Sequence, residues 1–197
     1  VCKGRSMLTV RSPFSCYKVS KPQQMIDFTK RFLISLLVVT STSCTGWQPD
    51  ALVEKSIIAA TLDSWHEAAA KADFNGYFNV LTDDAIFMGT DATEHWDKNE
   101  FITFAKPYFD KGKAWNFTAM ERHIYLDESG KLAWFDELLN TQMKICRGSG
   151  VVVKQGNVWK IKQYVLSMTI PNDQVDTIVK IKAPVEDVLI EQLQVNQ

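Results

Sequence analysis

The segment from Trp115 to Pro171 constrains the fold of this chain more than any other. It divides into four runs rich in Val, Ile, Trp, Phe and Tyr, separated by short turn sequences such as Asp127-Glu128-Ser129-Gly130 and Gln155-Gly156-Asn157. Apolar runs broken by Gly-containing turns predict an antiparallel meander. The four predicted strands are Trp115–Leu126, Lys131–Asn140, Gln142–Val153 and Val158–Ile170.

A sheet of this size needs an apolar partner on at least one face, and the preceding residues can supply it. Ala51–Ala72 predicts one long amphipathic helix, with Asp50 as its N-cap. Phe74–Leu81 predicts a second, shorter helix. Lys98–Lys111 predicts a third, which Pro107 should kink or cut short. The apolar stripe of the first helix is expected to contain Val53, Ile57, Ile58, Leu62, Trp65 and Ala69.

The order of these elements predicts the fold class. Ala85–Gly89 reads as a brief buried strand, so the chain runs helix, helix, strand, helix and then four antiparallel strands, which is an α+β order. A curved sheet wrapped around the first helix would form a cone whose open end is a pocket. After Asn172, two short amphipathic segments separated by Pro184 are expected to pack on the fold, with support of a dimer as the alternative.

Charge and cysteine usage narrow the function classes. Residues 1–43 carry seven Lys/Arg and one acid, which leaves fifteen Lys/Arg and twenty-two acids for residues 44–197. This acidic part has no basic stripe, so nucleic-acid binding is not expected. Cys146 is the one cysteine after residue 44, and it is expected to be a buried thiol in a strand.

The N-terminal region has the pattern of an export signal. Lys30 and Arg31 precede an apolar run of about eight residues, which is too short for a bilayer that needs roughly twenty. Three small residues then lead to Cys44, which resembles the lipobox cysteine of bacterial lipoproteins, although Ser41 stands where Leu is usual. Cleavage after Ser43 without lipid, or a helix that packs on the fold, are the alternatives.

These observations divide the chain into five parts. They are an upstream extension (1–24), an export signal with Cys44 as the lipidation candidate (25–44), a polar linker (45–50), the folded domain (51–172) and the tail (173–197). The expected location is periplasmic, or anchored to a bacterial membrane through the lipid alone.

Several blocks of the folded part carry a family resemblance: Asp63–Asp73, Tyr77-Phe78, Ala85–Trp96, Pro107-Tyr108-Phe109, Ala133–Glu137, Cys146–Gly150, Trp159-Lys160-Ile161 and Tyr164–Asn172. Together these blocks resemble the SnoaL-like branch of the nuclear transport factor 2-like superfamily. The resemblance implies a cone-shaped sheet around the first helix, and pairing of two copies through their outer sheet faces. It does not imply one activity, because the superfamily includes isomerases, cyclases, dehydratases, hydrolases and binding domains without chemistry.

A pocket of this kind would work through a carboxylate or imidazole among apolar walls, where burial raises a carboxyl pKa toward neutrality. Asp136 and Glu137 are adjacent on a strand, so only one can point inward. Glu137 does so if Ala133 and Phe135 face the core, and Asp136 does so if Trp134 and Leu138 face it. Arg147 is the candidate partner of the inward acid. A turn-stabilising role for the loop acids, and hydrogen-bonded structural roles for the histidines, are the alternatives. The catalytic candidates are Asp91, Glu94, Glu137, His66 and His123.

The expected ligand contacts are mainly aromatic. Arg147 could bind a ligand carboxylate, or pair with an acid on a neighbouring strand. Gly148 and Gly150 are expected to mark a bulge that bends the sheet. No P-loop, Rossmann, G-x-S-x-G or H-E-x-x-H motif is present, and no zinc spacing, so no cofactor or metal is expected. The ligand-binding candidates are Trp65, Tyr77, Phe87, Trp96, Tyr108, Trp134, Arg147 and Tyr164.

Three functional hypotheses follow. The preferred one is a domain that binds a small, largely apolar molecule in its cone. The second is an acid–base enzyme, and the third is a dimeric interaction domain without a cavity. A cavity lined by at least two titratable side chains within reach of a common point would favour the enzyme.

Overall fold

The computed structural model describes residues 50–195. The export signal with Cys44, and all of the linker except Asp50, lie outside the described residues. The elements, in chain order, are α2 (Ala51–Ala70), α3 (Phe74–Phe78), β1 (Leu81–Met88), β2 (His95–Asp97), α4 (Lys98–Asp110), β3 (Thr118–Leu126), β4 (Leu132–Thr141), β5 (Lys144–Gln155), β6 (Val158–Met168), the 3₁₀ turn η1 (Asn172–Gln174) and α5 (Val175–Val195).

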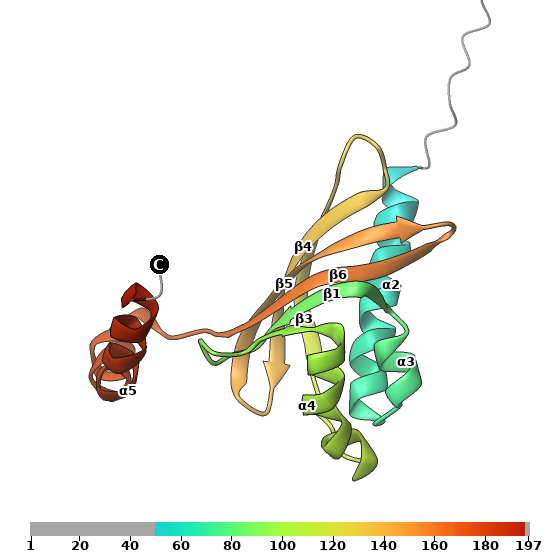
Figure 1. The fold of residues 1–197 in the computed structure, drawn as a ribbon. Coiled ribbons are helices and arrows are strands. Elements are labelled where there is room, and N and C mark those ends of the chain that lie inside the picture. The colour runs from blue at the N-terminus through green and yellow to red at the C-terminus, as the bar shows by residue number, and fades with distance from the viewer. Residues whose placement is uncertain (1–49, 196–197) are drawn as a thin grey trace, which may run out of the picture. The chain divides into compact units, whose positions relative to one another are not determined.

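The strands form one six-stranded sheet in the order β2-β1-β6-β5-β4-β3 (Figure 1). The predicted meander is confirmed, since β3, β4, β5 and β6 pair antiparallel in sequence order. The strand β1 is longer than predicted and pairs parallel to β6, while the short β2 pairs antiparallel to β1. The strand β2 was not among the predicted strands. Three residues give too little pattern for a strand to be recognised.

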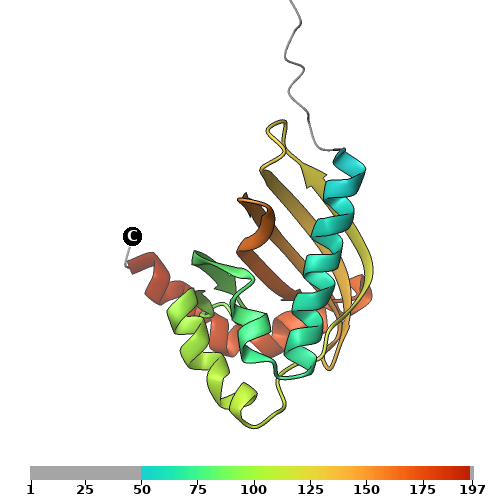
Figure 2. The ribbon, with the colours of Figure 1, turned by 90° about the vertical axis from the view of Figure 1, so that its right-hand side faces the viewer.

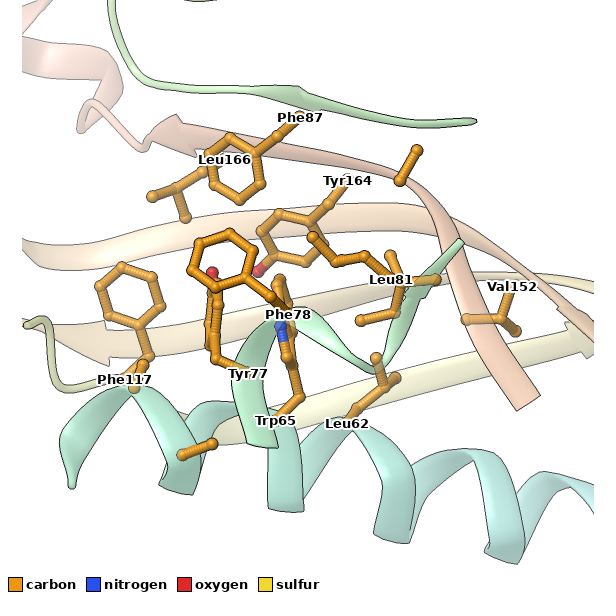
Figure 3. Close-up of a cluster of buried hydrophobic side chains, with 14 of the residues drawn as sticks. Leu62, Trp65, Tyr77, Phe78, Leu81, Phe87, Phe117, Val152, Tyr164 and Leu166 are labelled. Atoms are coloured by element: carbon orange, nitrogen blue, oxygen red, sulfur yellow. The ribbon is translucent and has the colours of Figure 1, made fainter. Parts of the chain in front are cut away.

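The sheet curves around α2, and α3 and α4 lie on the same side of it (Figure 2). The α+β fold with a curved sheet around the first helix is therefore confirmed. Figure 3 shows the core between these layers, where Leu62 and Trp65 of α2 face Tyr164 and Leu166 of β6. Cys146 is buried in β5, as expected.

The first helix buries four of the six residues expected on its apolar stripe, namely Ile58, Leu62, Trp65 and Ala69. Asp50 does cap it, because its side chain accepts a hydrogen bond from the backbone N–H of Leu52 (2.9 Å). However, Val53 and Ile57 are exposed, and the buried line runs through Glu54 to Ile58. Glu54 tolerates burial because its carboxylate accepts hydrogen bonds from Lys154 Nζ and Trp159 Nε1, both at 2.7 Å.

Neither Pro107 nor Pro184 ends a helix, which corrects the predicted division of the tail and the predicted shortening of the third helix. The helix α4 continues through Pro107 to Asp110, because burial of Phe101, Ala105 and Phe109 outweighs one missing backbone bond. The tail is one helix, α5, which continues through Pro184. The expected packing of the tail is also wrong, since α5 buries none of its residues. No helix in residues 50–195 has the length and apolar character needed to cross a bilayer.

Gly148 and Gly150 do not form the predicted bulge. Both keep regular pairing with β4 and β6, and the irregularity between β5 and β6 lies at Val151–Val152 instead. A β-carbon at Gly148 would overlap the hydroxyl of Tyr164. The glycine is therefore required for close approach of this side chain, and not for a bend in the backbone.

Candidate functional site

An apolar cavity of about 150 Å³ lies between β1, α4 and the start of β3. Its walls come from a strand and a helix. Phe87 is on the inward face of β1, and Phe101 and Phe104 are on α4. A capping box formed by Asp97 and Glu100 stabilises the start of α4. Leu166 and Met143 add aliphatic surface. The aromatic residues that line the cavity are Phe87, Trp96, Phe101, Phe104, Trp115 and Phe117.

The polar part of this cavity comes mainly from the turn between β1 and β2. Gly89, Thr90 and Glu94 line it there, and Gln142 lines it from the turn between β4 and β5. The backbone N–H of Gly89 donates to the carbonyl oxygen of Glu94 (3.0 Å), which closes the turn. Glu94 is therefore the one charged side chain among the residues that line the cavity.

A second polar group lies deeper, between α2 and the sheet. Glu137 is 1% exposed and lies on the inner face with Ala133 and Phe135, so the structure selects Glu137 over Asp136, the two alternatives that the alternation left open. Its Oε1 lies 2.8 Å from His66 Nε2 and accepts a hydrogen bond from Tyr164 Oη (3.0 Å). A carboxylate only accepts hydrogen bonds, so this histidine nitrogen carries a proton.

Arg122 completes this buried network. Its Nε donates to Glu137 Oε2 (2.8 Å), and its Nη2 lies 2.8 Å from the same oxygen. Its Nη1 donates to Ala59 O (3.1 Å) and to the mostly exposed Asp63 (2.8 Å). The network thus connects α2 to β3, β4 and β6, and both oxygens of Glu137 are in use.

Electrostatics keep Glu137 ionised and Tyr164 neutral. Burial alone would raise the pKa of Glu137, but the hydrogen bonds and charges of His66 and Arg122 outweigh it and lower this pKa. Burial, and then the negative charge of Glu137, raise the pKa of Tyr164 well above its ordinary value. An ionised carboxylate whose acceptors are occupied, outside the cavity lining, is poorly placed to take a proton from a molecule in the cavity.

The predicted catalytic candidates do not come together. Glu94 lines the cavity, while His66 and Glu137 belong to the buried network. Asp91 is exposed and accepts hydrogen bonds from the backbone N–H (2.9 Å) and hydroxyl (2.6 Å) of Thr93. It therefore stabilises the turn, which was the alternative to a catalytic role. These bonds lower its pKa. His123 lies half-exposed on the outer face, between Asp136 (3.1 Å) and Glu121 (3.3 Å).

The predicted ligand contacts divide into three groups. Phe87 and Trp96 line the cavity. Trp65, Tyr77 and Tyr164 are buried core residues that do not line it. The exposed residues of this set are Tyr108, Trp134, which stacks on Tyr125, and Arg147.

The suggested pairing of the inward acid with Arg147 is wrong, because Arg147 is on the outer face and Arg122 takes this role. Sequence reasoning missed Arg122, although a signal existed. Arg122, Ile124 and Leu126 occupy every second position of β3, and this spacing places all three on the inner face of the sheet. Its partner Asp63 lies one helical turn before His66 and gave no separate signal.

No group of three or more His, Cys, Asp or Glu in residues 50–195 is arranged to hold a metal ion.

Solved structures with this fold include a protein described as NTF2-like and of unknown function from Pseudomonas putida KT2440. It has 14% identity and a TM-score of 0.53, with 64% of this chain and 94% of that chain covered. A domain of unknown function with a cystatin-like fold from Nostoc punctiforme PCC 73102 has 16% identity and a TM-score of 0.53, with 74% and 99% covered.

The association domain of C. elegans CaMKII is also similar, with 16% identity, a TM-score of 0.50, and 59% and 96% covered. Identities this low show a common fold only. Whether this chain pairs with a second copy therefore stays a prediction.

Comparison with curated proteins gives no significant match. The family model of the SnoaL-like domain matches residues 58–171, more than half of the chain and nearly all of the curved sheet with its helices. This chain therefore belongs to the SnoaL-like domain family.

Proposed function

We propose that this domain binds a small, largely apolar molecule in the cavity between β1 and α4. The observation that carries the proposal is the lining itself, in which six aromatic side chains, Leu166 and Met143 surround a hollow with few polar groups. Ligand pockets are typically walled by apolar and aromatic side chains, with a small number of polar groups that fix orientation.

The size of the cavity limits the ligand. Its volume of about 150 Å³ is below the roughly 300–1,000 Å³ of pockets for drug-sized molecules. An engineered apolar cavity of roughly 150 Å³ in another protein binds benzene. A molecule with a single ring, or of similar bulk, is therefore the class that fits without rearrangement of the walls.

The geometry favours binding over acid–base catalysis. Catalysis would require two titratable groups near a common point, but the cavity lining contains only Glu94. Glu137 and His66 lie outside this lining, and both carboxylate oxygens of Glu137 already contact His66, Tyr164 and Arg122.

Filling the cavity should abolish binding. In Met143→Trp, the larger side chain is expected to occupy the hollow, while Met143→Leu nearly conserves volume and serves as the matched control. Saturation-transfer NMR with toluene as the probe should give a signal for the native chain and for Met143→Leu, and none for Met143→Trp. No signal with the native chain, or an equal signal with Met143→Trp, would contradict the proposal.

We also propose that the protein is exported and lipid-anchored through Cys44, on the basis of the basic, apolar and small-residue segments that precede it. Expressed in a bacterium, the full chain is expected in the membrane fraction, and Cys44→Ala in the soluble fraction, because one acyl-bearing residue supplies the anchor. Cys2→Ala, upstream of the signal, is the control. Unchanged fractionation of Cys44→Ala would count against lipidation.

A further inference from the structure

Five of the six aromatic side chains of the cavity lie in similar planes, namely Phe87, Trp96, Phe101, Phe104 and Trp115. The planes of Phe87 and Phe101 differ by 12°, with ring centroids 3.9 Å apart. Trp96 is inclined by 15° to Phe101 and by 23° to Phe104. Trp115 is inclined by 27° to Phe101, at a centroid distance of 6.0 Å. Parallel and offset rings favour a flat guest that extends the stack, since offset stacking is a preferred geometry of aromatic pairs.

Glu94 gives the lining of the cavity a negative charge. No Lys, Arg or His is among the residues that line it, and the remaining polar side chains there, Thr90 and Gln142, are neutral. Glu94 therefore adds a negative potential that no lining residue cancels. A negatively charged guest would meet repulsion, while a hydrogen-bond donor would meet an acceptor.

The backbone holds this carboxylate in place. Glu94 Oε2 accepts a hydrogen bond from the backbone N–H of Asp91 (3.1 Å). Gly89 has no β-carbon, and one built there would overlap the Glu94 carboxylate, so glycine allows the acid to lie against the chain. Oε1 has no hydrogen-bond partner within residues 50–195. It is thus the acceptor that a guest could use.

From these observations we infer that the cavity selects a single planar aromatic ring that carries an N–H or O–H donor and no negative charge, with the donor directed to Glu94. This inference rests on the proposed binding function and adds the chemical class of the ligand. The stacked rings supply affinity for the planar part, and the carboxylate supplies discrimination between substituents.

Four ring compounds of similar size separate these contributions. Toluene has no donor, phenol has a neutral donor, benzylamine has a cationic donor, and benzoate is an anion. Calorimetry or NMR titration with the native full chain measures the dissociation constants. Those of phenol and benzylamine should be at least about tenfold lower than that of benzoate, and that of toluene should be intermediate.

The test variant is Glu94→Gln, which keeps the shape of the side chain and an oxygen for the Asp91 N–H. It should reduce the tenfold discrimination to about threefold or less. The control is Asp91→Asn, which removes a charge from the same turn but from a residue that does not line the cavity. It should leave the discrimination unchanged.

The outcomes separate the inference from the proposed function. If toluene binds and benzoate binds as well as phenol, or if Glu94→Gln leaves their ratio unchanged, the assignment of ligand class is wrong and the binding function stands. If none of the four compounds binds the native chain, both fail.

Discussion

Replacing Glu137 with alanine is expected to lower the free energy of unfolding by about 3–5 kcal/mol. The carboxylate is buried, and it is the common partner of His66, Arg122 and Tyr164. Its removal would leave the Arg122 guanidinium without its main counter-charge in a site shielded from water. Urea denaturation at neutral pH, followed by circular dichroism, measures the loss.

Asp63→Ala is the matched control for this variant. Asp63 also pairs with Arg122, but its side chain is 65% exposed. Exposed ion pairs contribute about 1 kcal/mol or less, so the control should unfold close to the native midpoint. An equally small effect of both substitutions would mean that the network does not hold α2 to the sheet.

The same carboxylate should make stability depend on pH in the acid range. The pKa of Glu137 is lowered from 4.5 in the folded state, so the folded protein binds fewer protons than the unfolded chain as the pH falls past this value. Its contribution is fully present above the unfolded pKa and is lost as the pH falls through the folded one. Glu137→Gln should therefore be less stable near neutrality and lose less stability on acidification than the native chain.

Local sequence patterns predicted most of the fold. The four strands of the meander are apolar runs that end at turn residues, so pairing of neighbours followed directly. The alternation along β4 also implied that only one of Asp136 and Glu137 could point inward, but the choice between them follows only from the burial of Ala133 and Phe135 in the structure. The predictions that were wrong concern tertiary burial, which local patterns do not specify. Burial of its apolar face lets α4 continue through Pro107. Hydrogen bonds from Lys154 and Trp159 let Glu54 lie on the buried face of α2.

The candidate site was less predictable than the fold. Trp96 and Glu94 were identified because they follow the first strand, but Trp115 and Phe117 join them only because the chain returns from α4 to β3 at the same end of the sheet. Likewise, His66 and Glu137 were separate candidates in the sequence. Their contact at 2.8 Å depends on how α2 crosses the sheet, which no local pattern specifies.

Trp65→Ala is expected to lower the free energy of unfolding by about 3–5 kcal/mol, as for other buried aromatic residues replaced by alanine. Trp65 is 1% exposed and stacks on Tyr77, with ring centroids 4.9 Å apart. It also meets Tyr164 in a T-shaped arrangement at 4.8 Å. Its removal would leave a void between α2 and the sheet where Figure 3 shows these rings packed together.

Trp65→Phe separates the packing contribution from that of the indole N–H. This N–H is buried and has no hydrogen-bond partner in the described part of the chain, so phenylalanine keeps an aromatic ring and removes an unsatisfied donor. We expect Trp65→Phe to be clearly more stable than Trp65→Ala in thermal unfolding followed by circular dichroism. Because Trp65 does not line the cavity, toluene binding by Trp65→Phe should match that of the native chain. Equal losses of stability in the two variants would contradict the expectation that packing of an aromatic ring at this position supplies most of the contribution of Trp65.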